Sequence, residues 1–144
     1  MRMILTLFIL SLFTSCKSDK IEYQNVTYLH VSHTRTNANP NLDATIEGID
    51  YSKYDVLMLG GDLANLTSLD TQTMDHANSI FDFSSQSTLW ALGNHDYTDL
   101  NLVESYTGRL PYYAYTKNGI TFLVIDTQDD FSNISGNQKT FVDQ

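Results

Sequence analysis

The stretch that decides the fold is Thr88-Leu89-Trp90-Ala91-Leu92-Gly93-Asn94-His95-Asp96, an apolar run that ends on polar side chains. A second run, Val56-Leu57-Met58-Leu59-Gly60-Gly61, ends in the same way on Asp62. Uninterrupted apolar runs are typical of parallel strands that are buried on both faces. In open α/β sheets, sites are built at the edge where the strands end, so we expect Asp62 and Asn94 to meet there. Asp, Asn and His offer oxygen and nitrogen donors suited to Mn, Fe or Zn.

The rest of the chain extends this α/β plan in both directions. Strand-like runs occupy residues 26–32, 55–60 and 88–92, and apolar spacing predicts helices near 42–49 and over about 67–81. Thr67 and Asp70 are expected to cap the longer helix, and Thr98 to cap a helix that ends near Gly108. The Asn118-Gly119 pair between runs 112–116 and 120–126 is a hairpin signal. The predicted order is β-α-β-α-β-α-β-β, followed by a helix that begins near Gln138.

Composition bounds the class of protein. The chain has 144 residues, enough for one ordinary domain, and a net charge of −9, which argues against a nucleic-acid-binding surface. It contains 1 cysteine, Cys16, which excludes an intrachain disulfide.

The first residues have the pattern of an export signal. Arg2 precedes the apolar run from Met3 to Phe13, which is too short to span a bilayer. Leu-Phe-Thr-Ser-Cys resembles a bacterial lipobox, in which the cysteine becomes lipidated and forms the mature N-terminus. We therefore expect a lipoprotein-type signal peptide at residues 1–15, a tether at 16–24 and one domain at 25–144. A plain signal peptide and a buried N-terminal strand are the alternatives.

Gly61-Asp62 and Gly93-Asn94-His95-Asp96 resemble the second and third motifs of the calcineurin-like metallophosphoesterases, and the resemblance extends from Val26 to Gln144. It implies the N-terminal part of a four-layer α/β/β/α sandwich, with the domain at 25–144 incomplete at its C-terminus, and metal-assisted hydrolysis of phosphate mono- or diesters. It also implies that Asp62 bridges two metal ions and that Asn94 ligates one of them. His95 would face the substrate as a general acid, and Asp96 would orient its ring.

The first motif departs from the family. Where the family has Asp-x-His, this chain has His33-Thr34-Arg35. His33 can still ligate a metal, whereas the guanidinium of Arg35 has no lone pair to give and suits phosphate oxygens instead. We therefore expect one metal position to be weakened or lost, with Arg35 steering the phosphate. The alternative is that both are ordinary loop residues in a degenerate relative.

Four further groups of residues carry weaker expectations. His30 is interpreted as a hydrogen-bonded structural histidine and His76 as a solvated one. Arg109 and the run 112–115 line a substrate cleft or pack across the hairpin, and Asp126 shapes a loop. The family's two later His-containing segments are absent, and the sequence stops inside a predicted helix, so we expect the reading frame to continue beyond Gln144.

The sequence thus predicts an exported metal-dependent phosphoesterase, anchored through Cys16 in the periplasm or on the cell surface of a bacterium. It would hold one or two divalent ions (Mn, Fe or Zn) and act on small phosphate esters. The main alternative is a non-catalytic binding protein with the same fold, and a third is a surface lipoprotein whose motifs are vestigial. Metal content discriminates between enzyme and binding protein.

Overall fold

The computed structural model describes residues 25–128 and 133–144. The expected signal peptide, Cys16 and the tether therefore lie outside the described residues. Within those two ranges, no helix is long and apolar enough to cross a membrane.

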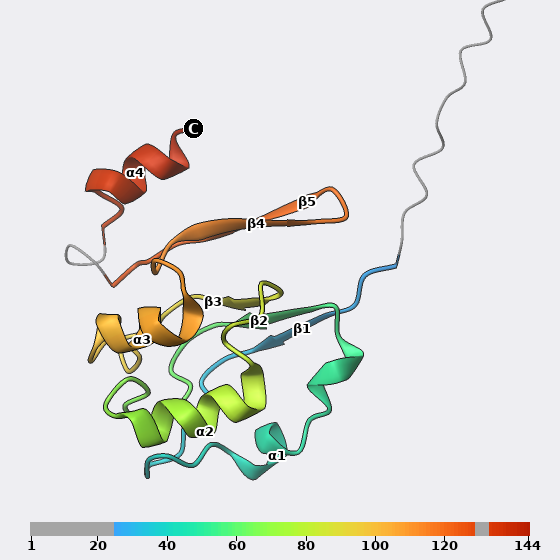
Figure 1. The fold of residues 1–144 in the computed structure, drawn as a ribbon, viewed down its shortest axis with the longest axis vertical. Helices are drawn as coiled ribbons and strands as arrows, with labels where there is room; N and C mark the ends of the chain where they lie inside the picture. The colour runs from blue at the N-terminus through green and yellow to red at the C-terminus, as the bar shows by residue number, and fades with distance from the viewer. Residues whose placement is uncertain (1–24, 129–132) are drawn as a thin grey trace, which may run out of the picture.

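Three parallel strands form the central sheet in the order β1-β2-β3 (Figure 1). Their bounds are β1 Tyr28–Val31, β2 Val56–Leu59 and β3 Thr88–Trp90. The register pairs Val31 with Leu59 and Leu59 with Trp90, so the three strands end level with one another. The loops that follow them therefore begin at the same edge, as the two apolar runs predicted.

Helices α1 (Ala44–Glu47), α2 (Thr71–Phe81) and α3 (Leu100–Thr107) lie on one side of this sheet, and the 3-10 turn η1 (Tyr51–Lys53) leads into β2 (Figure 1). The main core fills the space between sheet and helices. Its most buried members include Leu59, Leu63, Met74, Phe81 and Phe83. Phe83 stacks on Trp90 with ring centroids 4.4 Å apart, which joins the end of the α2 segment to β3.

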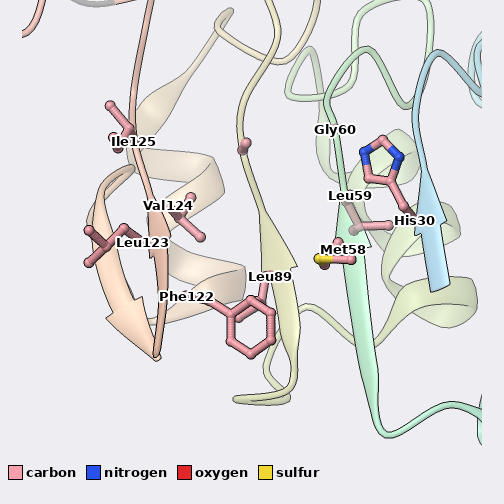
Figure 2. A pocket seen from close by; sticks show the side chains of 10 residues that line it. His30, Met58, Leu59, Gly60, Leu89, Phe122, Leu123, Val124 and Ile125 are labelled. Atoms are coloured by element: carbon pink, nitrogen blue, oxygen red, sulfur yellow. The ribbon is translucent and has the colours of Figure 1, made fainter. Parts of the chain in front are cut away.

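A hairpin covers part of the opposite face (Figure 1). Strands β4 (Tyr113–Lys117) and β5 (Ile120–Val124) pair antiparallel, and Asn118 and Gly119 have φ angles of 51° and 78°, as the Asn-Gly signal predicted. Val124 packs with Val56 and Leu89 in a second, smaller core. An apolar cavity of about 210 Å³ remains between this hairpin and the sheet (Figure 2). Helix α4 (Gly136–Val142) follows the hairpin.

Three local expectations are wrong. Helix α2 begins at Thr71, because Asp70 caps it by accepting from the Thr73 amide at 2.8 Å, and Thr67 instead lies buried in the preceding loop. Asp99 rather than Thr98 caps α3, accepting from the backbone amides at the start of that helix. His30 is exposed and lies at the rim of the cavity in Figure 2.

The observed architecture is mixed α/β, with one parallel and one antiparallel sheet. The helices, the sheet and the hairpin lie in successive layers in Figure 1. The complete four-layer sandwich stays a prediction.

Candidate active site

The loops after β1, β2 and β3 meet at the carboxyl edge of the sheet. The His33 amide donates to the Gly61 carbonyl at 3.0 Å, which joins the first loop to the second. The His95 amide donates to Asp62 Oδ1 at 3.2 Å, which joins the second loop to the third. The motif residues that are far apart in the sequence therefore form one cluster, as predicted.

Two glycines allow the second and third loops to approach this closely. Gly61 has a φ of +84°, and a Cβ added there would lie 2.4 Å from the Gly93 nitrogen. A Cβ added to Gly93 would lie 2.2 Å from Asp62 Oδ1. Real Cβ atoms do not approach other atoms so closely, so any side chain at either position would push the Asp62 loop away from the His95 loop.

His33 and Asp62 form the first contact of the site. His33 Nε2 lies 3.2 Å from Asp62 Oδ2, and the side chains are 68% and 5% exposed. Both residues have positive φ angles, 54° and 55°, although neither is glycine. Left-handed backbone at non-glycine residues is energetically costly and is concentrated at functional sites, which supports a functional role for this pair.

The ring of His95 is held by two groups from the other loops. Its Nδ1 lies 2.5 Å from the Asn65 carbonyl oxygen, which only accepts hydrogen bonds, so Nδ1 carries the proton. Nε2 then has a free lone pair and accepts from Arg35 Nη1 at 2.7 Å. Arg35 Nη1 also lies 3.2 Å from Nδ1, but that contact joins two donors and is not a hydrogen bond.

Asn94 precedes His95 in the third loop. Its side chain is exposed and makes no hydrogen bond to another residue in the described part of the chain. Its amide oxygen is therefore available to a ligand without breaking a contact within the fold.

Asp96 does not orient the His95 ring, so that expectation is wrong. Its buried carboxylate accepts from the backbone amides of Asp62 (2.8 Å), Leu63 (3.1 Å) and Gly93 (2.9 Å). It also accepts from the Thr67 hydroxyl and from the indole of Trp90 at 3.4 Å. Burial raises the pKa of Asp96 against the opposing effect of the Thr67 and backbone donors. Asp96 thus shapes the loop backbone that presents Asp62.

Sequence reasoning missed the side chains that tie the loops together. Asn39 donates to the Leu66 carbonyl and accepts from the Leu66 amide, both at 3.0 Å. The Thr34 hydroxyl donates to the Leu63 carbonyl at 2.8 Å. These bonds fix the loop that carries Arg35 against the loop that carries Asn65. Asn39 sits in an Asn-rich stretch that signals only a loop, so no pattern singled it out.

Other candidate residues lie elsewhere. Arg109 donates to the carbonyls of Phe83 (2.8 Å) and Thr88 (3.0 Å), at the opposite end of β3 from the site, and lies over the Tyr113 ring at 4.7 Å. It is therefore a packing residue and not part of a substrate cleft. His76 pairs with Glu47 at 2.8 Å instead of being simply solvated.

Asp126 shapes the loop after β5, as expected. Its carboxylate accepts from the Gln128 amide at 2.9 Å and from the Tyr97 hydroxyl at 2.9 Å.

The donors available for a metal are few. Across residues 25–128 and 133–144, no group of three or more His, Cys, Asp or Glu side chains is arranged to hold an ion. Adding the exposed amide of Asn94 to the His33 and Asp62 pair gives three donors from three loops, a chemistry that fits one divalent ion. Arg35 brings a fixed positive charge beside them and does not fit a second ion.

Comparison with known proteins agrees with the motifs. No curated protein matched this chain. The family model described as calcineurin-like phosphoesterase matches residues 29–143, which include all three strand-end loops, the hairpin and α4. The chain therefore belongs to the calcineurin-like phosphoesterase family.

Proposed function

We propose that this protein is a metal-dependent phosphoesterase that hydrolyses phosphate mono- or diesters. The observation that carries the proposal is the cluster of His33, Asp62 and His95 at the carboxyl edge of the sheet, in a chain of the phosphoesterase family. Members of this family generally bind divalent metals.

One divalent ion would be held by Asp62 and Asn94, with His33 as a third ligand. The buried Asp62 carboxylate supplies negative charge, and the exposed amide of Asn94 supplies a neutral oxygen. When bound, the ion supplies Lewis-acid chemistry to a phosphoryl oxygen. Mn, Fe and Zn all accept this donor set.

His95 and Arg35 would serve the phosphate. The Asn65 carbonyl fixes the ring of His95 with Nε2 directed toward Arg35, so substrate that engages Arg35 arrives beside Nε2. In the protonated ring, Nε2 would donate to the phosphate or to the leaving oxygen, as a general acid does. Asp96 would act through the loop backbone by holding the amides on either side of the Asp62 carboxylate.

The test is hydrolysis of p-nitrophenyl phosphate and bis(p-nitrophenyl) phosphate with added Mn, Fe or Zn and with chelator. We expect chelator to abolish turnover and Asp62→Asn to abolish it at any metal concentration. We expect His95→Ala to reduce turnover by roughly a hundredfold, as for a lost general acid, without releasing metal. Asp143→Asn and His76→Ala are matched controls and should keep wild-type rates. Chelator-resistant turnover, or a fully active His95→Ala variant, would rule out these roles.

A non-catalytic binding protein is the second candidate. The observation in its favour is the contact of Arg35 Nη1 with His95, since the expected motif has a metal ligand at the Arg35 position. Metal content measured by mass spectrometry discriminates between the two. A chain that holds no metal and hydrolyses neither ester, yet binds phosphate, is the binding protein.

We also propose the finer features that the sequence predicts: the four-layer sandwich, export, and a lipid anchor on Cys16. Labelling with a radioactive fatty acid should mark the wild type and leave Cys16→Ser unmarked. Equal labelling of both forms, or retention of the wild type in the cytoplasm, would exclude the lipoprotein.

A further inference from the structure

Arg35 carries a guanidinium edge that the fold does not use. Its Nη1 atom contacts His95. Within residues 25–128 and 133–144, its Nε and Nη2 atoms make no hydrogen bond, and no carboxylate forms an ion pair with it. The side chain is exposed in a chain whose net charge is −9. An exposed cation left unpaired in an acidic protein is available for an external anion.

The open edge has the geometry of an oxyanion receptor. The Nε–H and Nη2–H bonds of arginine are parallel and match two oxygens of a phosphate group. The backbone of Arg35 is held in place, because Arg35 pairs with Leu42 in an isolated antiparallel bridge. The two hydrogen bonds between Asn39 and Leu66 fix the same loop against the Asn65 loop. The fork therefore lies on a constrained loop, with its Nη1 atom against His95.

We infer that Arg35 is a specificity-determining residue that favours phosphate monoesters over diesters, an inference that rests on the proposed phosphoesterase function. A monoester has three unsubstituted oxygens and a charge near −2 at neutral pH. Two of these oxygens fill the Arg35 fork, and the third remains for the N–H donors beside it, the exposed amide of Asn94 and the His95 ring that contacts Arg35 Nη1. A diester has only two unsubstituted oxygens and one negative charge, so filling the fork leaves none for the rest of the site.

Binding to the full chain in chelator tests this inference without catalysis. Isothermal titration calorimetry would compare phenyl phosphate with methyl phenyl phosphate. We expect the wild type to bind the monoester at least tenfold more tightly. Arg35→Gln should weaken monoester binding by about tenfold to a hundredfold, the loss expected for charge-assisted hydrogen bonds, and should remove the preference. Arg35→Lys keeps the charge without the fork and should bind the monoester with a reduced preference.

The matched control is Lys53→Gln, which removes one positive charge from an exposed ion pair with Asp50 on another loop. It should bind both esters as the wild type does. Equal affinity of the wild type for the two esters, or a preference that survives Arg35→Gln, would overturn the inference. Failure of the proposed function has a different signature: neither ester is hydrolysed with any metal, while the binding preference and its dependence on Arg35 persist.

Discussion

Replacing Asp96 should lower the stability of the fold, because this residue joins the loops of the candidate site. Its carboxylate accepts from three backbone amides, those of Asp62, Leu63 and Gly93, and from the hydroxyl of Thr67. Asp96→Ala leaves these donors without an acceptor in the core, and each unsatisfied buried donor costs roughly 1–3 kcal/mol. Relaxation and water entry recover part of this, so we expect a loss of about 4 kcal/mol. That is a large share of the ~5–15 kcal/mol stability of an ordinary domain.

Asp96→Asn tests the hydrogen bonds alone, because asparagine has nearly the same shape as aspartate. Asparagine keeps one acceptor oxygen and places an NH₂ group against donors, so we expect a loss of about 2 kcal/mol, between wild type and Asp96→Ala. Urea unfolding can be followed by fluorescence of Trp90, because the chain has 1 tryptophan and its indole stacks on Phe83 beside this carboxylate.

The control is Asp143→Asn in the exposed pair with Lys139, which should change stability by less than about 0.5 kcal/mol. The reasoning is refuted if Asp96→Ala stays within about 1 kcal/mol of the wild type. It is equally refuted if Asp96→Asn is the more damaging of the two.

Three further predictions follow from the same contacts. Gly61→Ala should lower the free energy of unfolding in urea by more than about 2 kcal/mol, because its Cβ would lie 2.4 Å from the Gly93 nitrogen. Gly108→Ala also has positive φ but meets open space, so it should be less destabilising. The reverse order would contradict the close approach of the two loops. Glu47→Gln should flatten the acid side of the Tm-versus-pH curve. The histidine hydrogen bond lowers the pKa of Glu47 below 4.5, so its stabilisation is full above that value and is lost as pH falls through the folded-state pKa; parallel curves for variant and wild type would exclude this. The double change His33→Asp with Arg35→His should raise bound metal towards two ions per chain by mass spectrometry, and a wild type that already holds two would exclude the reasoning.

Much of the fold follows from periodicity and turn chemistry. The apolar runs around Val56 and Thr88 predicted buried parallel strands, and Asn118-Gly119 predicted the hairpin, because these signals are local. The start of α2 was predicted wrongly, because Thr67 resembles a helix cap in sequence but its hydroxyl is used by a carboxylate from another loop. Helix propensity and capping patterns describe neighbouring residues only, so they cannot show that a distant carboxylate binds this hydroxyl.

In the candidate site too, the features set by strand order were predicted, and those set by long-range contacts were not. The sequence placed Asp62 and His95 together, because parallel strands deliver their ends to one edge. It did not predict that a carbonyl at Asn65 and the guanidinium of Arg35 would hold the ring. A backbone carbonyl leaves no trace in residue identity, so any residue at position 65 would have looked equivalent. The role of Asp96 was missed because three of its partners are backbone amides and the others, Thr67 and Trp90, come from other segments.

The four residues of Gly93-Asn94-His95-Asp96 are subject to two different evolutionary constraints, one on folding and one on the proposed chemistry. Gly93 and Asp96 are required for the loops to pack, so a descendant that abandons chemistry must still keep them in order to fold. The Asn94 side chain is exposed and the His95 ring is half-buried against Arg35 and the Asn65 carbonyl, whereas the hydrogen bonds of Asp96 lie in the core. In a lineage drifting away from catalysis, the middle pair would therefore diverge first while the outer pair persists. Among relatives of this chain, we expect Gly93 and Asp96 to be kept wherever the loops pack in this way, and Asn94 and His95 to be kept only where the proposed hydrolysis is selected.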